Sequence, residues 1–108
     1  MAKTFEKATV LNFKAMIDYA EGGVVSKQVL KNSAGNITLF SFDKEEGLSE
    51  HSTPYDALVE VIEGQVEITI GGEKFTLSEG DSVIMPATVP HSLHGAERFK
   101  MLLTMIKG

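Results

Sequence analysis

The chain of 108 residues has no cysteine, no tryptophan and only three prolines. Without cysteine it can form no disulfide, no thiolate metal site and no cysteine nucleophile. It also lacks any run approaching the roughly 20 apolar residues of a membrane-spanning helix, and charges interrupt residues 1–14, where a signal peptide would need an apolar segment. We therefore expect a cytoplasmic protein without a membrane span.

Positive charge is scarce as well. Ten Lys and Arg residues stand against 15 Asp and Glu, which gives a formal net charge of -5 and a pI near 5.1. Nucleic-acid phosphates require a basic face, and anionic membranes attract clusters of Lys and Arg. We expect neither nucleic acid nor a membrane among the partners.

What the chain does have is a series of short β-type runs separated by turn residues. Strands are predicted over 24–31, 37–42, 57–62, 65–70, 74–77, 83–85, 88–92 and 99–106, with a further strand around His51. Glu63-Gly64 is predicted to be a hairpin turn between two of these runs, and Gly71-Gly72 another. Short strands at such regular spacing are typical of a β-barrel or a β-sandwich.

The N-terminal residues follow a different pattern. Residues 9–11 could form a strand that adds to a sheet edge. Asn12 is a suitable N-cap for a short helix that runs to about Tyr19 and ends before Gly22-Gly23. We expect one short helix in an otherwise all-β chain.

Two stretches place glycine, proline and histidine at fixed offsets. Residues 80–91 read GDSVIMPATVPH, and residues 47–64 read GLSEHSTPYDALVEVIEG. They resemble the two motifs of the cupin superfamily, G-x5-H-x-H-x3,4-E-x6-G and G-x5-P-x-G-x2-H-x3-N, and the chain resembles a small single-domain protein of the cupin 2 type.

The match is uneven between the motifs. In the second motif Gly80, Pro86 and His91 keep the spacing, whereas Thr88 stands at a Gly position and Gly95 at the Asn position. In the first motif, counted from His51, Gly64 matches. Thr53 stands at the second His position and Ala57 at the Glu position, so that two of the four usual metal ligands are missing.

The resemblance implies an all-β, jelly-roll type barrel of two antiparallel sheets, formed by a single domain over 1–108. Residues 1–23 would be the N-terminal arm and short helix, and residues 24–106 the barrel. It also implies a divalent metal at the barrel mouth, Mn, Fe, Zn or Ni. With His51 and His91 as the remaining ligands, that metal is expected to be weakly held or absent.

Strand alternation places residues 51, 53, 57, 59 and 61 on the inner face of such a barrel. His51 and His91 would then converge and either hold a metal, act as general acid and base near neutral pH, or remain as ordinary core and rim histidines. Asp56 could swing in as a further ligand, or it could cap the turn after Pro54. The candidate pocket wall comprises Thr53, Ala57, Val59, Val61 and Met85.

Three further features complete the candidates. Tyr55 could donate a proton or pack on the rim, so the catalytic candidates are His51, His91 and Tyr55. His94 should face away from the side of His91. Three methionines, Met85, Met101 and Met105, are interpreted as core-filling side chains.

The sequence is compatible with three functions. The resemblance implies a metal-dependent enzyme for a small polar metabolite, and the alternatives are a metal-free His-based isomerase and a metal-free ligand-binding or sensing module. A homodimer is expected, because Leu58 and Ile62 have the parity opposite to Val59 and Val61 and would need cover outside the barrel. Cupins commonly pair sheet to sheet with an exchanged N-terminal arm.

Overall fold

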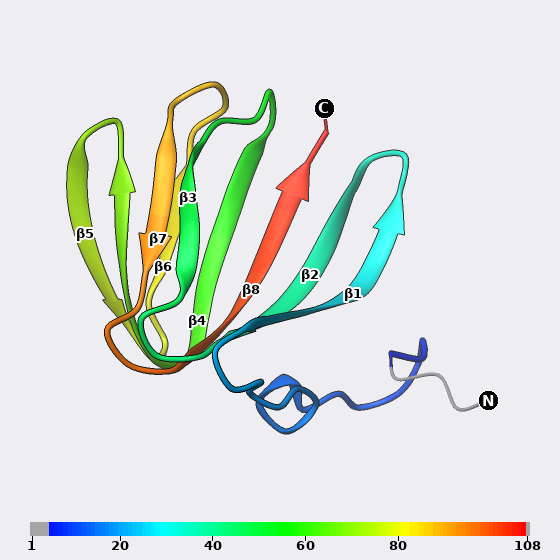
Figure 1. Cartoon of the computed structure of the whole chain (residues 1–108). Helices are drawn as coiled ribbons and strands as arrows, with labels where there is room; N and C mark the ends of the chain where they lie inside the picture. The colour runs from blue at the N-terminus through cyan, green and yellow to red at the C-terminus, as the bar shows by residue number, and fades with distance from the viewer. Residues whose placement is uncertain (1–4, 108) are drawn as a thin grey trace.

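The computed structural model describes residues 5–107, which are almost entirely β-structure (Figure 1). A 3-10 turn, η1 (Phe13–Ala15), precedes the strands. In chain order the strands are β1 (Val24–Asn32), β2 (Gly35–Phe42), β3 (Gly47–His51), β4 (Asp56–Ile70), β5 (Glu73–Ser78), β6 (Ser82–Met85), β7 (His91–His94) and β8 (Phe99–Ile106). The all-β prediction is confirmed.

The strands pair antiparallel in a strongly curled sheet whose order is β1-β2-β8-β4-β7-β3. Strand β4 belongs to both halves of the curl. Its first half pairs with β6 and β8, and its second half pairs with β5 and β7. The curl encloses an apolar core in which the rings of Phe42 and Phe99 stack with centroids 4.4 Å apart. This is the predicted barrel of two antiparallel sheets.

The hairpin predicted at Glu63-Gly64 is wrong, because β4 continues through both residues. The register with β8 shifts between Val61 and Glu63, and Gly64, with φ of +80°, lies opposite Phe99. A Cβ atom on Gly64 would lie 2.3 Å from the carbonyl oxygen of Arg98. The glycine therefore marks a bulge and a close approach of two backbones, where the chain does not reverse.

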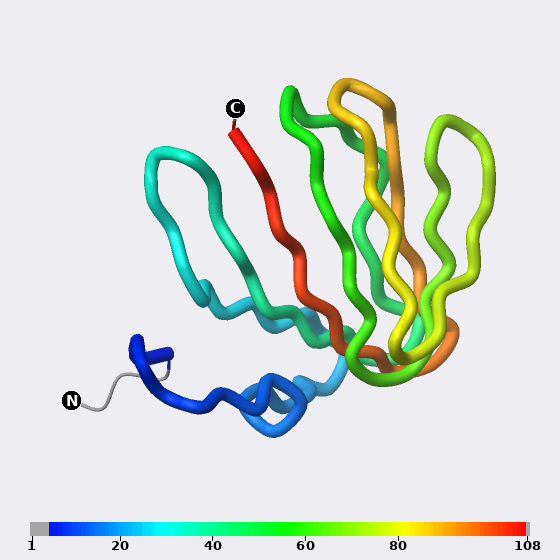
Figure 2. Tube along the Cα trace, turned by 180° about the vertical axis from the view of Figure 1, so that it is seen from behind, coloured from blue at the N-terminus to red at the C-terminus, as the bar shows by residue number. Residues whose placement is uncertain are grey.

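The N-terminal segment, residues 5–23, lies at the end of the sheet opposite the C-terminus of β8 (Figures 1 and 2). The predicted helix is limited to η1, and Asn12 makes no side-chain capping hydrogen bond. Residues 9–11 form no strand. Three sheet side chains hold this segment by donating to its carbonyl groups: Lys27 to Met16 at 2.8 Å, Ser41 to Asp18 at 2.8 Å, and Lys100 to Lys14 at 2.7 Å. Side-chain hydrogen bonds thus replace the expected helix and strand pairing.

A second apolar cluster lies under this segment, on the outer face of the sheet. Ile17 packs there with Leu39 and Leu102, and all three are buried. Ile62, one of the residues from which a dimer was predicted, also packs against this cluster. The chain itself therefore covers part of the outer apolar surface.

The remainder of the outer face carries an apolar row. Cross-strand pairing aligns Ile84 with Leu58, Leu58 with Thr104, Thr104 with Ile37, and Ile37 with Leu30. The two residues at the ends of the row, Ile84 and Leu30, are 64% and 48% exposed. The homodimer stays a prediction, and this row is the surface that a second copy would cover.

Asp43, which follows β2, links the N-terminal segment to the loop before β8 through hydrogen bonds. Its carboxylate accepts a hydrogen bond from the Gly22 amide at 2.6 Å and another from Arg98 Nε at 2.7 Å. These bonds, led by that of Gly22, lower the pKa of Asp43 to about 2.

No helix among residues 5–107 is long and apolar enough to cross a membrane.

Gly64→Ala should destabilise the fold more than Gly72→Ala. Both glycines have positive φ, so each alanine costs roughly 1–2 kcal/mol of backbone strain, but only Gly64 has backbone atoms in the way of a new Cβ. We expect an additional loss of at least about 1 kcal/mol at position 64. Urea unfolding of both variants would measure it, and equal losses would contradict the bulge assignment.

Asp43→Asn should lower stability at pH 7. A carboxyl whose pKa is lowered on folding stabilises the folded state above its unfolded pKa near 3.8, and this contribution disappears as the pH falls to about 2. The difference from the parent should therefore shrink between about pH 4 and pH 2 in denaturant titrations. The control is Glu79→Gln, which removes an exposed ion pair with Lys14 and should change little.

Ile84→Lys should shift the protein from dimer to monomer, because it places a charge in the exposed apolar row. Light scattering across micromolar concentrations gives the mass. Thr76→Lys adds the same charge at an exposed position of β5, outside the row, and should leave the dimer intact. A monomer mass for the parent at every concentration would refute the homodimer.

Candidate functional site

Two histidines meet at the open end of the barrel, the upper end in Figure 1, where the loops after β3 and β6 lie beside the end of β8. His51 is the last residue of β3 and His91 the first of β7, and the register pairs them directly. Their Nε2 atoms are 3.2 Å apart, and the ring planes meet at 70°. The sequence expectation that these two rings share one location agrees with this geometry.

The other ring nitrogens fix how the rings are protonated. His51 Nδ1 lies 2.7 Å from the carbonyl oxygen of Ser49, and His91 Nδ1 lies 3.2 Å from that of Val89. A carbonyl oxygen can only accept a hydrogen bond, so we assign the proton of each neutral ring to Nδ1. Both Nε2 atoms then carry lone pairs that face one another.

The two rings differ in their surroundings. His91 is only 4% exposed, whereas His51 is exposed at the mouth. Burial lowers the pKa of His91 below its usual value near 6.5; the Val89 carbonyl raises it in part, and the neighbouring His51 lowers it further. His91 is therefore mostly neutral at pH 7.

A small cavity of about 20 Å³ lies beside the pair. The two histidines, Thr53, Ala57 and three methionines line it. Three leucines, Leu48, Leu93 and Leu103, complete its wall. The volume suits one water-sized occupant, and it is far below the roughly 300–1,000 Å³ of a pocket that encloses a small organic ligand.

Most of the predicted pocket residues lie at this cavity. Thr53, Ala57 and Met85 line it, as the strand parity indicated. Val59 and Val61 do not border it, because β4 runs from the mouth into the barrel and carries them into the core, where they are buried.

Two further candidates, Asp56 and Tyr55, lie outside the cavity. The Asp56 carboxylate accepts a hydrogen bond from the Ala87 amide at 2.8 Å and so braces the loop after β6. The ring of Tyr55 lies 5.6 Å from Lys107 Nζ. The Thr53 hydroxyl donates to the carbonyl oxygen of Tyr55 at 2.9 Å, which fixes the turn between β3 and β4.

The donor chemistry at the mouth differs from the four-ligand set that the motif resemblance implies. Over residues 5–107, no cluster of three or more His, Asp or Glu side chains is arranged to hold a metal ion. The expected carboxylate position is Ala57, which contributes only a methyl group. The hard ions Mn and Fe, which favour mixed imidazole and carboxylate ligands, do not fit the residues present.

The three methionines of the cavity were interpreted from sequence as core fillers. Met85 on β6 and Met105 on β8 are the direct cross-strand neighbours of Ala57, one on each side. Met101 lies opposite Val61, deeper in the barrel. Strand parity alone places all three on the inner face, but it does not show that they meet the histidines.

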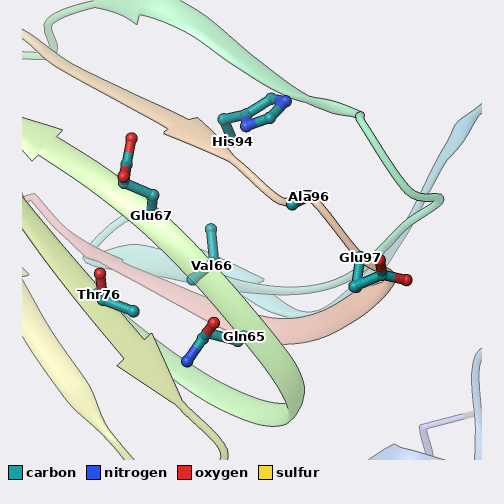
Figure 3. Close-up of a pocket in the computed structure, with 7 residues that line it drawn as sticks. All are labelled: Gln65, Val66, Glu67, Thr76, His94, Ala96 and Glu97. Atoms are coloured by element: carbon teal, nitrogen blue, oxygen red, sulfur yellow. The ribbon is translucent and has the colours of Figure 1, made fainter.

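A larger cavity of about 200 Å³ lies on the other side of β4, among β5, β7 and the turn after β7, and Figure 3 shows its lining. His94 belongs to this cavity, as its predicted outward direction indicated, and lies 3.8 Å from Glu45. Figure 3 shows Glu97 well apart from His94 and Glu67. The charged groups therefore do not converge on one point, and this cavity is separate from the histidine pair.

Known proteins share both the sequence pattern and the fold. Residues 38–106 match the family described as the cupin domain. A conserved protein of unknown function from Streptococcus pyogenes has a solved structure that is 35% identical and superimposes with a TM-score of 0.91, covering 98% of this chain and 93% of the other.

Two further relatives agree with this match. A cupin superfamily protein from Desulfitobacterium hafniense is 29% identical, with a TM-score of 0.91 and coverage of 98% and 97% of the two chains. An uncharacterised protein from Aquifex aeolicus is 26% identical over 94% of this chain and 85% of its own length. By its matched domain, and in agreement with its fold, the chain belongs to the cupin family.

Proposed function

We propose that this cupin binds a single late transition-metal ion at the barrel mouth, with Nε2 of His51 and Nε2 of His91 as ligands. The observation that carries the proposal is the pair of Nδ1 contacts to backbone carbonyls. A metal-ligating histidine usually donates its other ring N–H to such an acceptor, which orients the ring and keeps the ligating nitrogen free. Here both rings have this partner.

The separation of the two nitrogens also suits a shared ion. At metal–nitrogen distances of roughly 2.0–2.1 Å, two imidazoles on a tetrahedral ion stand about 3.3 Å apart. The Nε2 atoms of His51 and His91 are 3.2 Å apart. Little rearrangement of the rings would be required on binding.

The residues also indicate which ions and ligands would be accepted. Imidazole suits zinc, nickel and copper, whereas manganese prefers oxygen donors that this site lacks. Two neutral rings offset no charge, so a divalent ion would be held weakly. The enclosed cavity of about 20 Å³ is too small to hold a metabolite. Water or a small polar ligand would therefore bind at the mouth, on the exposed side of His51.

A metal-free function is the second candidate, as a His-based isomerase or a ligand-binding or sensing module. The 3.2 Å separation also suits one proton shared between the two rings. The lowered pKa of buried His91 disfavours a shared proton near neutral pH. It favours a metal ion, because the ion then need not displace a proton from the ring. We therefore prefer metal binding to the metal-free functions.

The test is metal binding by the parent and by His51→Ala, His91→Ala and His94→Ala. We expect one ion per chain in equilibrium dialysis, and a loss of affinity of at least about tenfold in the first two variants, since altering even an outer partner of a metal ligand costs this much. His94→Ala is the matched control, because His94 lines the larger cavity, which is separate from the histidine pair. Thermal unfolding would check that buried His91 can be replaced without loss of the fold.

Several ions must be offered, namely zinc, nickel and Cu(I), the last under reducing and anaerobic conditions. If none of them binds saturably to the parent, or if both histidine variants bind as well as the parent, the proposal fails. The metal-free functions would then be separated by substrate and ligand screening.

A further inference from the structure

We propose that the thioethers of Met85 and Met105 complete the ligand set at the histidine pair, so that the site selects the soft monovalent ion Cu(I). The proposal rests on the metal site at His51 and His91 and specifies its remaining ligands and its metal. It assigns a binding role to two residues whose type alone indicates only core packing.

Register places the two methionines beside Ala57, and the shared cavity places them near the histidine pair. Ala57 lines the cavity and is flanked across the ladder by Met85 on one side and Met105 on the other. Both methionines line the same cavity of about 20 Å³ as the two histidines. The two methionines therefore border the same small space as the two imidazoles.

The composition of this wall is unusual for a small chain. Three of the chain's five methionines line one cavity, and Met85 is 2% exposed. Three leucines share this wall with the methionines, so the buried thioether of Met85 lies in apolar surroundings. The wall of the cavity therefore combines thioether side chains with the exposed imidazole of His51.

Charge and softness then determine the ion. Two imidazoles and two thioethers form a neutral donor set, and the carboxylate-free wall offers nothing to balance a doubly charged ion. Thioether and thiolate ligands select Cu(I), and imidazole also suits copper. A site with this donor set should bind Cu(I) more tightly than Zn(II), the reverse of the preference that an added carboxylate would give.

Competition with a chromogenic Cu(I) chelator would measure the affinity of the parent and of Met85→Leu, Met105→Leu and the double variant. Leucine preserves apolar volume, so the fold should tolerate each change. We expect Cu(I) affinity to fall at least about tenfold in each single variant and further in the double variant. Met16→Leu is the matched control, because Met16 packs in the outer cluster under the N-terminal segment.

Methyl-labelled methionine gives a direct readout that does not depend on affinity. Cu(I) and the redox-stable Ag(I) are both diamagnetic, so either ion can be added in an NMR titration. The methyl signals of Met85 and Met105 should shift, whereas that of Met16 should not. Met101 lines the same cavity without being a proposed ligand, so equal shifts of all three cavity methionines would indicate proximity to the ion alone and contradict the thioether ligands.

Ala57→Glu tests the selectivity from the opposite direction. It adds a carboxylate between the two methionines, and it should raise Zn(II) affinity relative to Cu(I) by at least about tenfold. Its fold must be verified by circular dichroism, because the position is only 3% exposed. The methionine variants decide the question if this variant does not fold.

The results separate this proposal from the metal site on which it rests. Tight Cu(I) binding that weakens in the methionine variants supports both. Metal binding that depends on the histidines but is unchanged in the methionine double variant, or a parent that prefers Zn(II), overturns the thioether ligands and leaves the histidine site standing. Absence of any saturable binding overturns both.

Discussion

The whole arrangement depends on β4 remaining one strand while it passes from one half of the curl to the other. Its two halves pair with different neighbours, and the change occurs where the register slips beside Gly64. A turn at this point would have ended the ladder. Instead the bulge bends the strand, so β3 and β7 are brought over β8 and the barrel closes around its core. The positions of both histidines follow from this bend.

Local structure then orients the rings. Each histidine Nδ1 contacts the carbonyl oxygen two residues before it in the chain, at Ser49 for one and Val89 for the other. The bend of β4 decides where the two strand ends meet, and these short-range bonds decide which ring nitrogens point inward. The orientation of both rings thus follows from backbone contacts, and groups that are held in this way bind a ligand with little reorganisation.

The sequence predicted the fold class and the meeting of His51 with His91, because motif spacing and strand parity are both visible in it. It did not predict the continuity of β4, since glycine after glutamate is equally compatible with a hairpin and with a bulge where backbones approach closely. It also could not reveal that Met105 neighbours Ala57. That contact joins residues far apart in the chain and depends on a register that only the folded sheet defines.

The N-terminal segment is held against the sheet in a different way. Lys27, Ser41 and Lys100 hold it through backbone carbonyls, which every residue type possesses, and Ile17 is the one residue of this segment, within the described part of the chain, that is buried. Phe5, Phe13 and Met16 pack against the same outer cluster, and the Tyr19 hydroxyl donates a hydrogen bond to Glu63, so these side chains are constrained as well. Most of the other side chains of the segment are exposed. Over evolutionary time the exposed positions of this stretch can change while its path is kept, so homologous arms should align by shape at positions where they no longer align by residue.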